Sequence, residues 1–128
     1  MSSSISPPGV VLFAHGARDP AWAAPFERLR ALTQAAMPAA DVRLAFLELM
    51  QPDLPTAVAQ QVAAGAQRIT VIPVFLGQGG HVRRDLPQLL EQLRQAHPQL
   101  TLATVPAVGE DEAVLQAIAA YCVGAAGA

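Results

Sequence analysis

Short apolar runs alternate along the chain with longer amphipathic stretches. The apolar runs lie at residues 10–14, 42–47, 68–76 and 100–105, and the last is the weakest. Runs of this length that are apolar at nearly every position predict strands buried on both faces. The longer stretches between and after them carry apolar residues at helical spacing, so we expect four strands that alternate with four helices.

Capping residues mark the ends of the first two helices. Asp19 followed by Pro20 predicts an N-cap and a first helical position, and this helix should run to about Met37. Asp53 predicts the N-cap of the second helix, and Gly65 predicts its end.

The last two helices have weaker start signals. Asp85 predicts the start of the third helix, which should end near His97. The acidic residues 110–112 predict the first turn of the final helix, where the helix dipole favours negative charge, and Gly124 predicts its end. Cys122 on this helix should lie in the core.

The order of these elements predicts an α/β fold in which a parallel sheet has helices on both faces. Right-handed crossovers favour the strand order 2-1-3-4. We expect residues 1–128 to form a single domain, with 1–8 and 124–128 flexible.

Composition and charge exclude several classes of protein. Hydrophobic residues make up 52% of the chain and charged residues 14%, which excludes a disordered protein. No apolar run approaches the roughly 20 residues that a membrane-spanning helix needs. The net charge of -2, without a basic stripe, gives no support for a nucleic-acid partner.

Two residue types are scarce. All 8 basic residues are arginines, so neither a Schiff-base lysine nor a Walker A lysine is present. A single cysteine excludes an internal disulfide. The first nine residues have no features of a secretory signal, so we expect a cytoplasmic protein.

Three side chains with metal-binding chemistry follow three of the predicted strands. His15 follows the first strand, Glu48 ends the second, and His81 lies in the loop after the third. Ligands of open parallel sheets bind beyond the carboxyl ends of the strands, where the strand order reverses. Neighbouring strands are about 4.8 Å apart, so these side chains can converge. Two imidazoles and a carboxylate can hold a divalent metal while leaving positions open.

Glycines and arginines surround these candidate ligands. The segment Gly77–Gly80 is glycine-rich, but without lysine it is a weak candidate for a phosphate cradle and serves equally well as a flexible loop or as a floor for a flat ligand. Arg18, Arg83 and Arg84 lie close in sequence to the two histidines. Together they suggest an acidic ligand, because arginine pairs well with carboxylates.

Three segments carry a resemblance to a known family. They cover residues 12–20 (LFAHGARDP), 45–52 (AFLELMQP) and 72–87 (IPVFLGQGGHVRRDLP). In order, spacing and strand context they resemble small single-domain sirohydrochlorin chelatases of the CbiX/SirB type, over residues 10–120. The chain departs from the family at Ala17, where the first motif commonly has serine.

The resemblance implies a chelatase-like fold and a metal chelatase activity. The enzyme would insert Co²⁺ or Fe²⁺, with Ni²⁺ as a further candidate, into sirohydrochlorin during cobalamin or siroheme biosynthesis. The metal is a substrate, and no organic cofactor or ATP is implied. His15 and His81 would bind the metal, with Glu48 as a third catalytic group.

The chemistry of such a substrate suggests how the tetrapyrrole is held, because the glycine-rich loop can approach a flat ring and arginines can bind its many carboxylates. The expected substrate contacts are Arg18, Gly79, Gly80, Arg83 and Arg84. Related chelatases are often twice this length, with two similar halves around one cleft, so a homodimer is implied here.

Other functions remain open from the sequence. A metal or tetrapyrrole carrier needs the same ligands as a chelatase and differs only in lacking turnover. Histidine phosphatases also end their first strand in His-Gly, but they have arginine where this chain has Ala14. An interaction module would leave the placement of His15, Glu48 and His81 as coincidence. Cobalt, iron and nickel all accept the ligand set.

Overall fold

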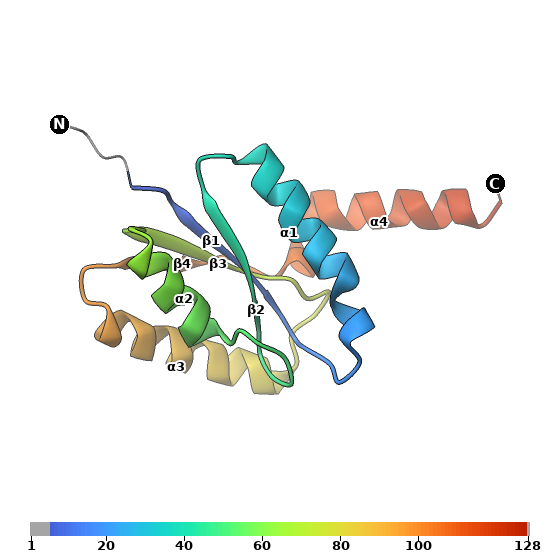
Figure 1. The fold of residues 1–128 in the computed structure, drawn as a ribbon. Helices are drawn as coiled ribbons and strands as arrows, with labels where there is room; N and C mark the ends of the chain where they lie inside the picture. Colours follow the sequence, from blue (N-terminus) through green and yellow to red (C-terminus); the bar gives the residue numbers. More distant parts are fainter. Residues whose placement is uncertain (1–5, 128) are drawn as a thin grey trace.

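The computed structural model describes residues 6–127, with His81 described in its backbone only (Figure 1). The strands are β1 (Gly9–Ala14), β2 (Asp41–Phe46), β3 (Arg68–Pro73) and β4 (Thr101–Thr104). The helices are η1 (Pro20–Ala23), α1 (Ala24–Ala36), α2 (Leu54–Ala63), α3 (Gly80–Ala96), η2 (Val108–Glu110) and α4 (Glu112–Ala125). Within this part of the chain, no helix is both long enough and apolar enough to cross a bilayer.

The four strands form one parallel sheet in the order β2-β1-β3-β4, which confirms the predicted topology. Strand β1 lies in the interior of the sheet, and all six of its residues are buried. Its Leu12 pairs with Leu44 on one side and Ile72 on the other. The strand order therefore reverses between β1 and β3, and ligands of such sheets bind beside this point.

Two apolar clusters cover the two faces of the sheet. One cluster packs α2 and α3 against the sheet through residues such as Val58 and Leu90. The other packs η1 and α1 through Ala23, Trp22 and Phe26. Figure 1 shows α1 on one face and α2 with α3 on the opposite face. Helix α4 contributes no residue to either cluster.

The predicted caps of the first two helices are confirmed, with one refinement. Asp19 accepts a hydrogen bond from the Ala21 amide at 2.9 Å, but it caps the short 3-10 turn η1 rather than α1 itself. Asp53 caps α2 by accepting from the Thr56 amide at 2.9 Å. Gly65 follows the end of α2 with a φ of 106°, the left-handed conformation that glycine adopts most easily.

The predicted start of the third helix is wrong by five residues. Helix α3 begins at Gly80, and its N-cap is Gly79, which contributes no side-chain hydrogen bond. Asp85 lies in the second turn instead of capping the helix. The apolar stripe extends upstream of it, because Val82 and Leu86 are four residues apart and both are buried. His81 is therefore a helical residue and not a loop residue.

The prediction for the end of the chain also needs correction. Helix α4 runs through Gly124 to Ala125, and Cys122 is exposed rather than in the core. Apolar composition suggested burial, but α4 extends away from the sheet (Figure 1). Among the predicted flexible ends, residues 1–5 and 128 lie outside the described part of the chain, and flexibility elsewhere in these ends stays a prediction.

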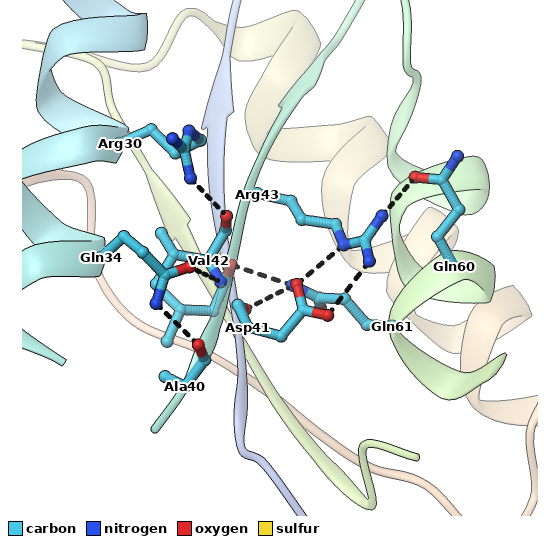
Figure 2. A network of polar contacts seen from close by, with 9 residues as sticks. Arg30, Gln34, Ala40, Asp41, Val42, Arg43, Gln60 and Gln61 are labelled. Carbon is cyan, nitrogen blue, oxygen red and sulfur yellow. Dashed lines mark hydrogen bonds and ion pairs between the residues drawn. The ribbon is translucent and has the colours of Figure 1, made fainter. Parts of the chain in front are cut away.

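A polar network joins α2 to the amino end of the sheet (Figure 2). Arg43 donates to both carboxylate oxygens of Asp41, at 2.7 and 3.1 Å. The buried Gln61 donates to the carbonyl oxygens of Val10 and Asp41, at 3.1 and 2.8 Å. The hydrogen bond from Arg43 is the main reason that the pKa of Asp41 is lowered. These contacts pin β1, β2 and α2 to one another.

The other side of edge strand β2 is covered by α1. Gln34 accepts a hydrogen bond from the Val42 amide at 3.2 Å, and Arg30 donates to the Val42 carbonyl at 3.3 Å. Figure 2 shows both side chains reaching from α1 to β2. Backbone groups of an edge strand can pair with another chain, and these two side chains occupy them at Val42.

Candidate functional site

The structure brings His15 and Glu48 together at the carboxyl end of the sheet. The pairing of β1 with β2 continues past both strands, because the Leu47 amide donates to the Ala14 carbonyl at 2.9 Å and the Glu48 amide to the His15 carbonyl at 3.1 Å. His15 Nε2 then lies 3.1 Å from Glu48 Oε2. The side chains are 51% and 55% exposed, so a ligand in solvent can reach them.

Gly16 makes this close approach feasible. Its φ is 98°, in the left-handed region, and a Cβ atom on it would overlap the carbonyl oxygen of Glu48. A larger residue would therefore push the His15 loop away from the Glu48 loop. Leu49, directly after Glu48, also has a positive φ of 68°, which is uncommon for a residue with a side chain.

A pocket of about 300 Å³ opens beside the pair. Its lining consists of His15, Glu48, Leu47, Phe75, Val82, Gly77 and Gly79. The Phe75 ring stands nearly edge-on to the His15 ring, with centroids 6.4 Å apart. The pocket thus combines one polar pair with apolar walls, which suits a largely apolar ligand that has a few polar groups.

The glycines after β3 leave space at this pocket. A Cβ atom on Gly77, Gly79 or Gly80 would have no described atom within 4 Å to meet. None of the three has the positive φ that would itself require glycine. Packing therefore does not demand glycine at these positions, and the open space is available to a ligand.

Sequence reasoning missed Gly109, which fixes the loop after β3. The Gly109 amide donates to the Phe75 carbonyl at 2.9 Å. A Cβ atom on Gly109 would overlap the backbone of Leu76. Gly109 lies in η2, more than thirty residues further along the chain, and no local sequence signal connects it to Phe75. Sequence reasoning also gave Phe75 only a strand role, because β3 was expected to continue to Leu76 and instead ends at Pro73.

The third predicted ligand lies on a different element from the one expected. His81 is the second residue of α3, next to the pocket-lining residues Gly79 and Val82 in sequence. Among the side chains that the structure describes, no three His, Cys, Asp or Glu residues form a cluster that could hold a metal. The structure therefore brings together two of the three predicted ligands, His15 and Glu48, and metal binding by all three stays a prediction.

The structure places the arginines that were predicted to contact substrate at different sites. Arg18 and Arg84 are exposed and do not line the pocket beside His15. Arg83 lines a neighbouring pocket on the β4 side of α3. Of the two glycines predicted to contact substrate, Gly79 lines the His15 pocket, and Gly80 is the first residue of α3.

A larger hollow, of about 510 Å³, lies at the other end of the molecule between the loops that precede β3 and β4. Its lining includes a single titratable side chain, His97. We therefore place the candidate site at the smaller pocket, where two such groups are in contact.

The geometry of His15 and Glu48 suits a shared divalent ion. Ligand atoms about 2.1 Å from a tetrahedral metal lie about 3.4 Å from each other. The observed separation of 3.1 Å is close to this value. A neutral imidazole and a carboxylate can bind such an ion, and either can accept a proton.

Comparisons with known proteins agree with this picture. A sirohydrochlorin cobaltochelatase of Methanopyrus kandleri is 35% identical over 81 residues, or 63% of this chain and 57% of that protein. A crystal structure of a cobalamin (vitamin B12) biosynthesis CbiX protein from Marinobacter aquaeolei VT8 is 30% identical. It covers 92% of this chain and 96% of its own, with a TM-score of 0.82.

The sirohydrochlorin chelatase SirB of Bacillus subtilis subspecies spizizenii, solved in complex with cobalt, has 25% identity and a TM-score of 0.72. The match covers 89% of this chain but 49% of the SirB chain. The matched segment thus spans about half the length of SirB and of the Methanopyrus protein. The CbiX protein family itself matches residues 9–122, from the first strand into the last helix. The chain belongs to the CbiX family.

Proposed function

We propose that this chain is a sirohydrochlorin chelatase that inserts Co²⁺ or Fe²⁺ into the tetrapyrrole, as a step of cobalamin or siroheme biosynthesis. The observation that carries the proposal is the exposed His15–Glu48 pair, 3.1 Å apart at the edge of a pocket with apolar walls. Relatives named as sirohydrochlorin cobaltochelatases and a SirB structure in complex with cobalt support the same chemistry.

The pair would present the metal, which is a substrate here. A metal that is to be transferred must be held by few ligands, and exposed ligands leave its other positions open to the pyrrole nitrogens. His15, Glu48 and the predicted ligand His81 fill this role. Insertion releases two pyrrole N–H protons, and the Glu48 carboxylate accepts them one after the other and passes each to solvent.

The walls of the pocket would orient the macrocycle. Phe75 and Val82 offer apolar surface, and Gly79 leaves room for a flat ring to approach the backbone. Gly80, Arg18 and Arg84 remain proposed contacts to the rim of the substrate and its carboxylates. The cytoplasmic location expected from the sequence also stays a prediction.

The proposal includes a homodimer, which the exposed apolar surface of α4 supports. After Glu112 the helix carries no charged residue, and its Tyr121 and Val123 are 75% and 60% exposed. A 14-residue helix is about 21 Å long and about 10 Å across. If two chains exchange such helices, each partner covers one face of its own helix and an equal receiving surface, together about 420 Å², which is about half of the roughly 800 Å² per partner that is typical of stable complexes. The occupant we propose is a second copy, because this chain matches 49% of the SirB chain and a second copy would add a segment of similar length.

Sedimentation velocity tests the dimer. We expect a dimer at micromolar protein and a monomer for Tyr121→Glu, since a charge would have to be buried at the interface. The matched change Gln116→Glu, on the same helix but at an already polar position, should leave the dimer intact. A monomeric wild-type protein would contradict the proposal.

Turnover distinguishes a chelatase from a carrier. Purified protein is mixed anaerobically with sirohydrochlorin and Co²⁺ or Fe²⁺, and the absorption change is followed over many turnovers. We expect multiple turnovers that disappear in the double variant His15→Ala, His81→Ala. Arg28→Gln, an exposed change on α1, is the control and should retain the wild-type rate. Substrate binding without a rate above uncatalysed insertion would favour the carrier.

A further inference from the structure

A second pocket adjoins the candidate site on the β4 side of α3. Its volume is about 280 Å³, close to that of the first pocket. The apolar side chains Leu86 and Leu90 of α3 contribute to its lining. Its polar lining comes from Gln78, Arg83, Arg94 and Thr104. The chemistry proposed for His15 and Glu48 gives this second pocket no function.

The charged side chains that line this pocket are all positive. Two guanidinium groups line it, and the lining contains no carboxylate. Arg94 is already engaged, because its Nε and Nη2 donate to the Leu102 carbonyl at 3.2 and 2.9 Å. Arg83 is exposed and has no hydrogen bond or ion pair with any side chain that the structure describes. Arg83 is therefore the cation that is free to bind an anion.

One segment of chain separates the two pockets. Gly77, Gly79 and Val82 line the His15 pocket, whereas Gln78 and Arg83 line the second. Thr104, at the end of β4, is two strands away from β1, a distance of about 9.6 Å across the sheet. A ligand with its centre in the first pocket can thus place a short substituent in the second.

We propose that the second pocket binds a carboxylate-bearing substituent of the tetrapyrrole and that Arg83 is its ligand. This inference rests on the proposed chelatase function. Val105, which is exposed, packs against the methylene groups of the substituent, and Arg83 forms a charge-assisted pair with its carboxylate. Arg83 acts on substrate affinity and orientation, and it takes no part in binding the metal.

The test compares Arg83→Gln with wild type. We expect the KM for sirohydrochlorin to rise about tenfold, in line with the loss of one charge-assisted hydrogen bond. The Kd for sirohydrochlorin without metal, measured by fluorescence, should rise by the same factor. Both kcat and the KM for Co²⁺ should stay within about twofold, because the metal ligands are untouched. Arg83→Lys should recover part of the affinity, since it keeps the charge but loses the planar fork.

A control and a modified substrate make the test specific. Arg68→Gln removes an exposed arginine at the opposite end of β3 and should leave both constants unchanged. With the methyl-esterified tetrapyrrole, wild type and Arg83→Gln should bind equally, because the carboxylate that Arg83 recognises is gone. An effect of Arg83→Gln that persists with the ester would overturn the proposal.

The two proposals fail in different ways. If wild type turns over and Arg83→Gln has the wild-type KM and Kd, the second pocket is not a carboxylate site, and the chelatase function stands. A change confined to the KM for Co²⁺ would likewise overturn the role of Arg83. If wild type neither binds nor metallates sirohydrochlorin, the chelatase proposal itself is wrong, and the role of Arg83 is lost with it.

Discussion

The two ends of the sheet use polar side chains in opposite ways. At the amino end, Asp41 and Arg43 are paired through two hydrogen bonds and their side chains are 17% and 35% exposed. Gln61 beside them is fully buried. At the carboxyl end, His15 and Glu48 share one contact of 3.1 Å and are more than half exposed.

The polar groups at the amino end of the sheet stabilise the fold, whereas those at the carboxyl end are available to bind a ligand. Buried polar atoms need partners, and among the described side chains Gln61 Oε1 is the one buried nitrogen or oxygen atom without a hydrogen bond. His15 and Glu48 keep most of their hydrogen-bonding capacity unused by the protein. We expect changes at the amino end to alter stability and changes at the carboxyl end to alter activity.

Gly16→Val should have the strongest effect of all the variants, and it would damage stability at the functional end of the sheet. The valine Cβ would overlap the Glu48 carbonyl oxygen at a φ of 98°, so the two loops must separate. We expect the free energy of unfolding to fall by about 3 kcal/mol, measured by urea denaturation, together with loss of metal insertion.

Gly79→Ala is the matched control for this variant. A Cβ atom there meets open space, and the backbone angles of Gly79 (φ -71°, ψ 164°) suit alanine. Stability should stay within about 0.5 kcal/mol of wild type. The KM for sirohydrochlorin should rise, because the methyl group enters space that the ligand uses. Equal destabilisation by both variants would refute the distinction between the two glycines.

Glu48→Gln tests whether the carboxyl end of the sheet serves activity rather than stability. We expect the rate of metal insertion to fall about 100-fold, because a proton acceptor and metal ligand is lost. The midpoint of urea denaturation should not change, since the side chain is exposed and makes one contact. A stability loss without a change in rate would assign Glu48 to the fold instead.

Gln61→Leu is the corresponding change at the amino end. It leaves the carbonyl oxygens of Val10 and Asp41 without the donor they now have. We expect the free energy of unfolding to fall by about 1.5 kcal/mol. The rate per folded molecule should be unchanged, as judged by active-site titration. A slower rate in fully folded protein would show that the two ends are coupled.

The smallest expected effect is a pH dependence of stability that Asp41→Asn weakens. The pKa of Asp41 is lowered chiefly by Arg43, and that of Asp53 by hydrogen bonds from Thr56. Both carboxylates therefore stabilise the fold above the unfolded pKa of about 3.8, and this contribution is lost as the pH falls through their lower folded values. In Asp41→Asn, the free energy of unfolding at pH 7 should fall by about 1 kcal/mol, and it should vary less with pH in the acid range. An unchanged acid limb in denaturation curves would refute this account.

The α/β class, the strand order and the ends of most elements could be predicted from the amino-acid sequence alone. These features depend on signals within a few residues, such as the apolar runs of the strands and the caps at Asp19 and Asp53. Parallel topology then placed His15 and Glu48 at one edge, because both follow strands that end there. The family resemblance came from segments that surround the same edge.

Features that join distant segments could not be predicted in this way and emerge from the packing of the folded chain. The approach of Gly109 to Leu76, the early start of α3 and the second pocket beside Arg83 depend on how two elements pack, and neither element encodes that packing alone. The exposure of Cys122 has the same origin. An apolar helix is buried only where a surface exists to receive it, and within one chain α4 lies against neither apolar cluster.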